Sequence, residues 1–279
     1  QRRAASHVDG PMLVLAGPGS GKTTVITRRT RYLIEDCHVK PSEILVITFT
    51  KAAAREMRER FLRQIKSDGT KVSFGTFHAV FFQILKLAYG YGAENILREE
   101  QKYQFLRDSV RKANLEPDDE AEFISDVAAE ISRVKNERCD LNTYHASVCN
   151  SAVFKGIFHD YDNRLRRSNL IDFDDMLVYC YELLRERPDI LGAWQRKYRY
   201  ILVDEFQDIN QLQYDIVRLL AAPEDNLFIV GDDDQSIYRF RGAKPQIMLN
   251  FEKDYPKAKR VVLDANFRST AEIVKGAGK

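Results

Sequence analysis

One short glycine-rich segment constrains this sequence more than any other. Residues 16–23 read Ala-Gly-Pro-Gly-Ser-Gly-Lys-Thr, the phosphate-loop pattern with alanine in place of the first glycine. Such a loop needs a tight turn with few side chains, so that successive backbone N–H groups can surround phosphate oxygens. The helix that follows directs its positive dipole end at the same anion. The segment therefore predicts a strand–loop–helix unit that binds a nucleoside triphosphate.

Two side chains of this loop carry specific roles. Lys22 is expected to reach the β- and γ-phosphates, and the Thr23 hydroxyl to ligate Mg²⁺. A flexible turn that matches the pattern by accident is disfavoured, because the loop follows an apolar run and opens a helical pattern. The expected nucleotide-binding residues of this region are Ala16, Gly17, Pro18, Gly19, Ser20, Gly21, Lys22, Thr23 and Thr24.

A second motif ends the apolar run at residues 200–203, where Asp204 and Glu205 follow. In a phosphate-loop enzyme, Asp204 would hold the Mg²⁺ and Glu205 would orient or deprotonate the attacking water. Strands that merely end in solvated acids are common, so the pairing with the phosphate loop is what favours hydrolysis. The sequence contains no Asn-Lys-x-Asp to read guanine and no Leu-Ser-Gly-Gly-Gln of a transporter ATPase. A small-molecule kinase would not need the long helical insertion described next.

Apolar runs and helical patterns alternate along much of the chain, which predicts an α/β fold with right-handed crossovers. The middle differs, because no strand pattern is found from about residue 78 to residue 198. The predicted strands, buried on both faces of a parallel sheet, are residues 12–16, 44–48, 72–74, 200–203, 227–230 and 261–263. The helical stretches predicted in the middle are residues 99–112, 120–135, 144–165 and 173–186.

Composition sets broad limits on the protein. With 44% hydrophobic and 30% charged residues it resembles a globular cytoplasmic protein, and no apolar run approaches the ~20 residues of a membrane span. No signal peptide opens the chain. The four cysteines lack the spacing of zinc or redox sites, which favours reduced, buried thiols. A net charge of +2 requires any nucleic-acid contact to come from a local patch.

Further segments carry a family resemblance. They are residues 47–57 (Ile-Thr-Phe-Thr-Lys-Ala-Ala-Ala-Arg-Glu-Met), 75–78 (Gly-Thr-Phe-His), 171–175 (Ile-Asp-Phe-Asp-Asp), 204–210 (Asp-Glu-Phe-Gln-Asp-Ile-Asn), 230–243 (Val-Gly-Asp-Asp-Asp-Gln-Ser-Ile-Tyr-Arg-Phe-Arg-Gly-Ala) and 263–269 (Leu-Asp-Ala-Asn-Phe-Arg-Ser). With the phosphate loop and Gln1, they resemble the motifs of the UvrD/Rep family of superfamily 1 DNA helicases, in the family's order and over essentially the whole chain.

The resemblance implies a RecA-like P-loop NTPase sheet with an inserted all-helical subdomain. The domains expected from it are residues 1–77, the first part of an ATP-binding lobe; 78–198, the helical insertion; 199–264, the second part of the lobe; and 265–279, the start of a second RecA-like lobe. The function implied is that of an ATP-dependent translocase that moves 3′ to 5′ on single-stranded DNA. Its expected partners are single-stranded DNA, junctions of single strand and duplex, and unidentified repair or replication proteins, with no membrane.

The family also implies residue roles. Gln1 would bond the adenine edge while Phe267 stacks on its face. Gln235 would contact the γ-phosphate and the attacking water, and Arg268 would neutralise charge on the transferred phosphoryl group. We do not assign the acids at 232–234 to a metal, because they lie in a loop that presents Gln235. The residues implied in DNA binding, by stacking along a basic track, are Phe49, Thr76, Phe77, His78, Phe173, Tyr238, Phe240 and Arg241.

Several positions depart from the family pattern. Thr24 stands where arginine is frequent, so the base would be stacked on one side only. Phe267 replaces tyrosine and loses a hydroxyl, and Phe240 replaces tryptophan and offers a smaller stacking surface. Lys51-Ala52 replaces Asn-Lys, which shifts a cation by one position. The arginines at 55, 58 and 63, and at 164, 166 and 167, are either solvated helix surfaces or phosphate contacts.

The family's later motifs belong to a second lobe, and translocation requires two lobes that open and close around ATP. We therefore expect residues 1–279 to be a piece of a longer protein that alone binds ATP weakly, hydrolyses it slowly or not at all, and does not unwind duplex. Two alternatives stay open: the motor subunit of a helicase–nuclease complex, and a non-catalytic DNA-binding module switched by ATP. Loss of turnover with retained ATP binding in Glu205→Gln would distinguish a motor from a switch.

Overall fold

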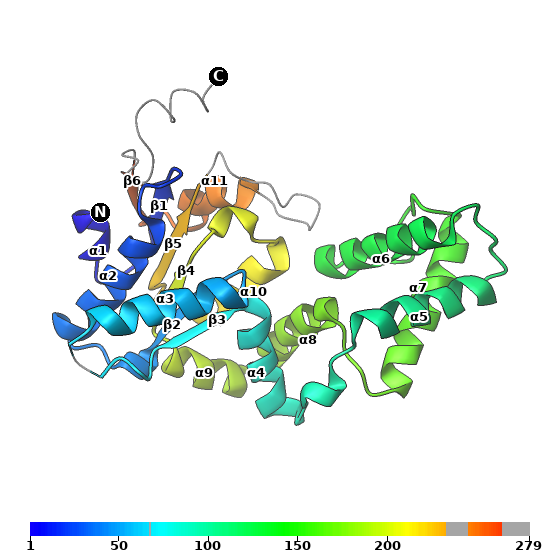
Figure 1. The fold of residues 1–279 in the computed structure, drawn as a ribbon, viewed down its shortest axis with the longest axis horizontal. Coiled ribbons are helices and arrows are strands. Elements are labelled where there is room, and N and C mark those ends of the chain that lie inside the picture. The colour runs from blue at the N-terminus through cyan, green and yellow to red at the C-terminus, as the bar shows by residue number, and fades with distance from the viewer. Residues whose placement is uncertain (67, 233–244, 264–279) are drawn as a thin grey trace, which may run out of the picture. The chain divides into compact units, whose positions relative to one another are not determined.

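Six short apolar segments form one parallel sheet in the computed structural model, which describes residues 1–66, 68–232 and 245–263 (Figure 1). The strands are β1 (Met12–Ala16), β2 (Ile44–Thr48), β3 (Ser73–Thr76), β4 (Tyr200–Val203), β5 (Leu227–Gly231) and β6 (Lys259–Leu263). Their order across the sheet is β3-β2-β4-β5-β1-β6, and every neighbouring pair is parallel. The predicted α/β fold with a parallel sheet is thereby confirmed.

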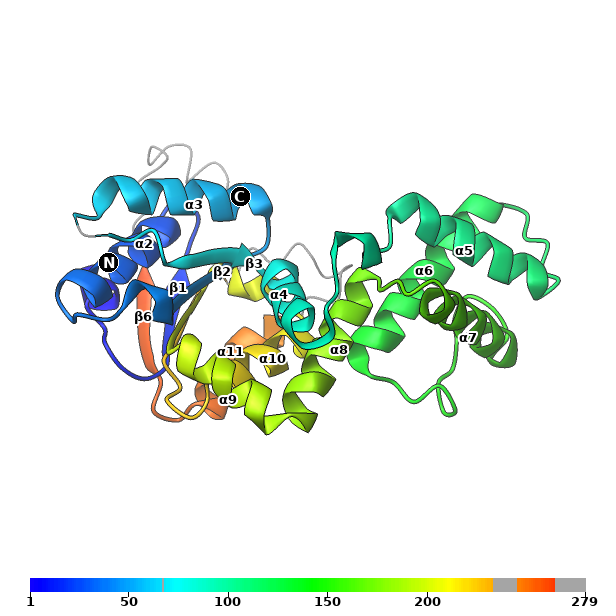
Figure 2. The same ribbon diagram turned by 90° about the horizontal axis from the view of Figure 1, so that it is seen from below.

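Helices cover both faces of this sheet, as Figure 2 shows. On one face lie α1 (Arg2–Ala5), α2 (Lys22–Glu35) and α3 (Lys51–Gln64); on the other lie α9 (Pro188–Lys197), α10 (Gln211–Ala221) and α11 (Pro245–Asp254). Alternate strand residues such as Val14, Val46 and Leu202 are buried in one cluster with Ile26 of α2 and Phe61 of α3. The intervening strand residues are buried as well. Burial on both faces explains why the strands are continuous apolar runs.

The common direction of the strands brings several chain segments to one edge. β1 leads into the phosphate loop, and β4 leads into Asp204, Glu205 and the short helix η3 (Phe206–Asp208). β5 ends beside Asp232, while β2 ends beside Phe49 and β3 runs directly into α4 (Phe77–Tyr89). Ligand-binding residues in parallel sheets lie at the carboxyl ends of the strands. Lys22, Asp204 and Glu205 therefore meet at this edge because of topology, although they are far apart in sequence.

A second compact unit comprises residues 81–183 and is built from helices. Its main helices are α5 (Glu99–Lys112), α6 (Glu120–Glu137) and α7 (Ser151–Arg167), with η2 (Ala93–Asn95) and part of α8 (Phe173–Glu186). One hydrophobic cluster joins them, with Leu106, Ile131 and Ile157 fully buried at its centre. These apolar residues recur on one face of each helix, so the helices bury their faces against one another.

The observed division of the chain differs from the expected domain limits. Residues 184–198, expected in the helical insertion, belong with the sheet-containing unit, which comprises residues 1–80 and the described residues from 184 onward. The cause is α9, which begins with Pro188 at its first turn and buries Trp194. The Gln195 Nε2 also donates to the Leu219 carbonyl of α10 over 2.9 Å. The short helix η1 (Pro41–Glu43) leads into β2.

The helix predicted over residues 144–165 is wrong at its beginning, since α7 starts at Ser151. The Asn150 side chain caps it by accepting the Ala152 N–H over 2.9 Å. Before this cap, the chain is held by Glu130 of α6, whose carboxylate accepts the N–H groups of Ser147 and Val148 over 2.7 and 3.0 Å. Residues 144–150 are accordingly not helical. The predicted helix begins too early because apolar residues recur at helical spacing in this loop as well.

Two expectations from composition can be compared with the structure. Among the helices of the described ranges, none is both long and apolar enough to cross a membrane. All four cysteines are free thiols, but only Cys180 is buried, while Cys37, Cys139 and Cys149 are half-buried. The expectation of buried thiols is therefore right for one of them and wrong for three.

The Glu130 contacts generate a stability prediction. Replacing Glu130 with alanine should lower the free energy of unfolding by about 1–3 kcal/mol, because the Ser147 and Val148 N–H groups lose a charged acceptor. Asp126→Ala, an exposed position of the same helix, is the control and should change stability by about 0.5 kcal/mol at most. Urea denaturation followed by circular dichroism measures both. Equal stability of the two variants would contradict the role given to Glu130.

Candidate functional site

The phosphate loop has the geometry that its sequence predicts. α2 begins at Lys22, and its N-cap Gly21 has φ of 92°, in the left-handed region that favours glycine. A Cβ atom at Gly21 would lie 2.7 Å from Nε2 of Gln1, so the position is also closed by a neighbour. Ser20 is buried, and its hydroxyl donates to the Gly17 carbonyl over 2.7 Å. The loop is thus closed on itself directly before the helix N-terminus.

Gln1 lies against this loop. Its Nε2 donates to the Ser20 carbonyl over 2.8 Å, although the two residues are separated by the whole of β1. The amide therefore lies directly beside the loop. At the start of α2, the carbonyls of Thr23 and Thr24 accept the Thr27 hydroxyl over 3.0 and 3.2 Å. These bonds secure the first turn that carries the Thr23 side chain.

Lys22 connects the loop with the acids that follow β4 and β5. Its Nζ lies 3.2 Å from Oε2 of Glu205 and 3.9 Å from Oδ2 of Asp232. Asp232 is 1% exposed. The sequence assigns no role to Asp232. It is the pairing of β5 with β1 that brings this residue close to Lys22. The arrangement is one ammonium group facing two carboxylates at the carboxyl edge of the sheet.

Asp204 lies deeper than Glu205. It is 4% exposed, and its Oδ1 accepts the N–H of Glu205 over 3.1 Å. Burial, followed by the charge of Glu205, raises the pKa of Asp204 to about 7, against the weaker opposing effect of Lys22. The negative charge of the Asp204 carboxylate is therefore only partly balanced by the protein's own groups. A cation beside it would stabilise its charged form.

The residues present fit Mg²⁺. The ion prefers oxygen ligands, and usually takes only one or two from the protein, with phosphates and waters as the others. The Asp204 carboxylate and the Thr23 hydroxyl are such oxygens, at the ends of β4 and at the start of α2. No cluster of three or more metal-ligating side chains occurs in the ranges that the structure describes. These residues therefore do not surround a metal ion with protein ligands alone.

Glu205 has an unusual backbone. Its φ of 52° and ψ of 43° lie in the left-handed region, which non-glycine residues seldom occupy. Such strain persists only where surrounding contacts hold it, and it is frequent at functional sites. The next residue but one, Gln207, is 2% exposed and donates its Nε2 to Oε2 of Glu205 over 2.9 Å. Gln207 lies within the motif of residues 204–210, but the sequence of this motif does not reveal the contact between Gln207 and Glu205.

The aromatic residues after β2 and β3 form a pair. The rings of Phe49 and Phe77 are 5.1 Å apart at 61°, an edge-to-face contact. Phe49 is half-exposed, whereas Phe77 is 1% exposed, so its ring is not available to stack on a base. Thr76 is also buried, and its hydroxyl accepts the Ala79 N–H over 3.2 Å. Here the structure differs from the expectation of direct DNA contact for Phe77 and Thr76, because Phe77 packs against Phe49 and Thr76 holds the start of α4. His78 is half-buried.

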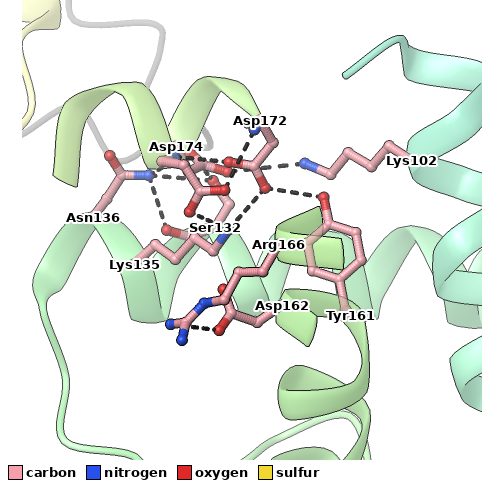
Figure 3. A network of polar contacts seen from close by, with 10 residues as sticks. Lys102, Ser132, Lys135, Asn136, Tyr161, Asp162, Arg166, Asp172 and Asp174 are labelled. Atoms are coloured by element: carbon pink, nitrogen blue, oxygen red, sulfur yellow. Dashed lines mark hydrogen bonds and ion pairs between the residues drawn. The ribbon is translucent and has the colours of Figure 1, made fainter. Parts of the chain in front are cut away.

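In the helical unit, the segment Ile171–Asp175 contains one exposed ring and three tethered acids. Phe173 is 57% exposed. Asp172 and Asp175 pair with Nζ of the buried Lys135 over 2.9 and 2.6 Å, and Asp172 also accepts the Tyr161 hydroxyl over 2.9 Å. Figure 3 shows these groups converging from α6, α7 and α8. The network fixes the backbone on both sides of Phe173.

The third acid of this segment is held from another direction. Asp174 accepts bonds from Ser132 over 2.9 Å and from Asn136 over 2.7 Å, and Lys102 of α5 lies 3.8 Å away (Figure 3). At the start of α8, the Asp175 N–H donates to Oδ1 of Asp172 over 2.7 Å, which caps the helix. Burial raises the pKa of Asp175 to about 7, with the charge of Asp172 acting in the same direction and Lys135 opposing it.

Other sequence predictions have different outcomes. The candidates Gln235, Tyr238, Phe240, Arg241, Phe267 and Arg268 lie outside the described residues. Of the two arginine groups left open, Arg164 and Arg166 pair with Asp160 and Asp162 over 2.7 and 2.9 Å, and Arg63 lies 3.8 Å from Glu59. Ion pairs on exposed helices are typical of solvated surfaces.

Comparison with known proteins gives a consistent result. The sequence model of the UvrD/REP helicase N-terminal domain matches residues 1–256. The chain is 42% identical to the putative ATP-dependent DNA helicase YjcD of Bacillus subtilis, over 99% of the chain and 37% of that protein. It is 38% identical to the probable DNA helicase II homolog of Mycoplasma capricolum, over 98% of the chain and 39% of that protein. It is 37% identical to the ATP-dependent DNA helicase PcrA of Staphylococcus aureus, over 100% of the chain and 39% of that protein.

The buried network around Lys135 generates a prediction. Lys135→Met should lower the free energy of unfolding by about 3–5 kcal/mol, because two buried carboxylates lose their cation. Lys102→Met is the matched control, since its ammonium is more exposed and 3.8 Å from Asp174; it should cost about 1 kcal/mol or less. Urea denaturation measures both variants. A loss of the same size in Lys102→Met would show that Lys135 has no special place in the network.

Proposed function

Because the chain belongs to the UvrD/REP helicase N-terminal domain family, we propose that it is the ATP-binding part of a motor that moves along single-stranded DNA. The observation that carries the proposal is the position of Lys22, whose ammonium lies 3.2 Å from Glu205. A phosphate-binding lysine and a candidate catalytic carboxylate thus share one site. The chain spans 37–39% of the length of the curated relatives compared above, so the activity of a whole protein is part of the proposal.

Nucleotide binding would change the partners of Lys22. The ammonium now compensates Glu205 and Asp232, and a triphosphate at the loop offers it a denser negative charge. Backbone N–H groups at the start of α2 would receive the phosphate oxygens. When Lys22 turns to the β- and γ-phosphates, the Glu205 carboxylate is released to accept a proton from the attacking water. Binding of the substrate therefore prepares the base.

Mg²⁺, when bound, would neutralise charge on the phosphates. Asp204 and Thr23 are the residues proposed to hold it, by the fit described above. The Asp204 carboxylate, with its pKa raised to about 7 by burial, would become fully charged beside a cation. Its hydrogen bond from the Glu205 N–H also ties the metal-binding residue to the residue that handles the proton.

The remaining nucleotide roles rest on the family resemblance. We assign Gln1 to the adenine edge, which is compatible with its bond to Ser20 of the loop. Phe267 is assigned to stacking on the base, Gln235 to the γ-phosphate and the attacking water, and Arg268 to the transferred phosphoryl group. The substrate is accordingly ATP.

On the DNA side, the exposed aromatic faces support stacking on bases. Phe49 and Phe173 are the candidates with accessible rings, and Tyr238, Phe240 and Arg241 join them by resemblance. His78 is proposed to contact the strand, whereas Phe77 supports the position of Phe49 and Thr76 supports the start of α4. We propose 3′ to 5′ movement on single-stranded DNA, action at junctions with duplex, and repair or replication proteins as partners.

Substitutions at the nucleotide site test the hydrolytic part of the proposal. Lys22→Ala should weaken ATP binding about 10–100-fold, the equivalent of about 1.5–3 kcal/mol for lost bonds to a charged group. Glu205→Gln should bind ATP normally and lose about 10²–10⁴-fold in turnover, because the proton acceptor is gone. Fluorescent-nucleotide titration and phosphate release in the full-length protein provide both numbers. Full turnover by Glu205→Gln would refute hydrolysis by this site.

Phe173→Ala tests the DNA part. It should weaken binding of a single-stranded oligonucleotide about 5–150-fold, since stacking of a base on an aromatic ring contributes about 1–3 kcal/mol. Tyr89→Ala is a matched control, because this ring belongs to the same unit and is 55% exposed. Fluorescence anisotropy at fixed salt measures both. If the two variants lose affinity equally, Phe173 is not a specific base contact.

A further inference from the structure

The amide of Gln207 contacts two of the segments that form the nucleotide site. Its Nε2 donates to Oε2 of Glu205 over 2.9 Å, and its Oε1 accepts the N–H of Asp232 over 3.0 Å. The side chain is 2% exposed, so water does not compete for these bonds. One end of the amide thus touches the candidate base after β4, and the other touches the backbone after β5.

The contact with Glu205 complements that of Lys22. Both the Gln207 amide and the Lys22 ammonium approach the same oxygen, Oε2, over 2.9 and 3.2 Å. When Lys22 turns to the phosphates, Gln207 still holds this oxygen, because its own position does not depend on the lysine. The other carboxylate oxygen, Oε1, is then directed away from Gln207 and can meet a water molecule.

The structure keeps space for Gln207 at the end of β5. A Cβ atom at Gly231 would lie 2.8 Å from Oε1 of Gln207 and 2.6 Å from Sδ of Met248. Real Cβ atoms do not approach other atoms so closely, so an alanine would displace the amide or the Met248 side chain. Glycine at this position is therefore what allows Gln207 to reach the Asp232 N–H. The aromatic ring of Phe206, fully buried against Tyr214 and Phe251, anchors the same short helix.

We infer that Gln207 is a positioning residue that holds the Glu205 carboxylate for hydrolysis and links it to the chain after β5. This inference rests on the proposed function and names the group that sets the geometry of its base. Asp232 directly precedes the segment that carries Gln235 and Tyr238 in the sequence. The link is a chain of two hydrogen bonds made by the buried Gln207 amide.

Two substitutions of Gln207 distinguish the effects of its two hydrogen bonds. Gln207→Glu keeps an oxygen for the Asp232 N–H but cannot donate to Glu205, whereas Gln207→Met removes both bonds at similar volume. Each should lower kcat about 10–100-fold, the range typical of residues that orient a reactive group, with little change in ATP affinity. Gln211→Met is the matched control, since its amide donates along α10, to Asp215 over 2.8 Å, and its kcat should not change. Phosphate release with and without single-stranded DNA, and nucleotide titration, are measured in the full-length protein.

The outcomes distinguish this inference from the proposed function. Normal kcat in both Gln207 variants, beside an inactive Glu205→Gln, would overturn the inference alone, as would a parallel loss of ATP affinity and kcat. Absence of turnover in the unsubstituted protein would overturn both. If the Gln207 variants do not fold, Gly231→Ala displaces the amide from the other side. A kcat lowered about 10-fold with retained ATP affinity would then support the inference, and an unchanged kcat would overturn it.

Discussion

One ammonium group compensates the acids at the carboxyl edge of the sheet, and the arrangement of the site depends on it. Lys22 lies within 4 Å of both Glu205 and Asp232, with the buried Asp204 behind them. Carboxylates gathered in a poorly hydrated place repel one another and tend to bind protons unless a cation is near. The loop, the end of β4 and the end of β5 are therefore held together by a charge that a triphosphate can attract away. The same interaction stabilises the protein without ligand and makes it responsive to ligand.

The sheet makes this interaction possible. β1 pairs with β5, and β5 with β4, so the lysine after β1 reaches acids that lie about 180 residues or more further along the chain. The next strands, β2 and β3, place Phe49 and its supporting ring Phe77 at the same edge. The nucleotide candidates Lys22, Asp204 and Glu205 and the DNA candidate Phe49 thus belong to one row of strand ends. Gln207 adds a direct contact within this row, because it bonds both Glu205 and the backbone of Asp232.

In the helical unit, too, an ammonium group lies between carboxylates, but here the groups are buried. Lys135 is buried between Asp172 and Asp175, and Tyr161 donates to the first of them. Removing a partner from such a group is costly, so the network specifies how the start of α8 is placed. Asp172 and Asp175 consequently stabilise the backbone at the start of α8. Phe173, between them, stays at the surface with 57% of its area exposed.

The sequence by itself determined the features that depend on neighbouring residues. Glycine spacing and the apolar runs predicted the phosphate loop, the parallel strands and the acids after β4, because turns and strand periodicity are local. Only the tertiary structure decided which side chains are accessible and which meet. Phe77 is buried under Phe49, α7 begins late because Glu130 binds the preceding loop, and Gln207 reaches Asp232, all through contacts between distant segments. A pattern of residue types cannot reveal such contacts, because burial and hydrogen-bond partners are set by how the whole chain packs.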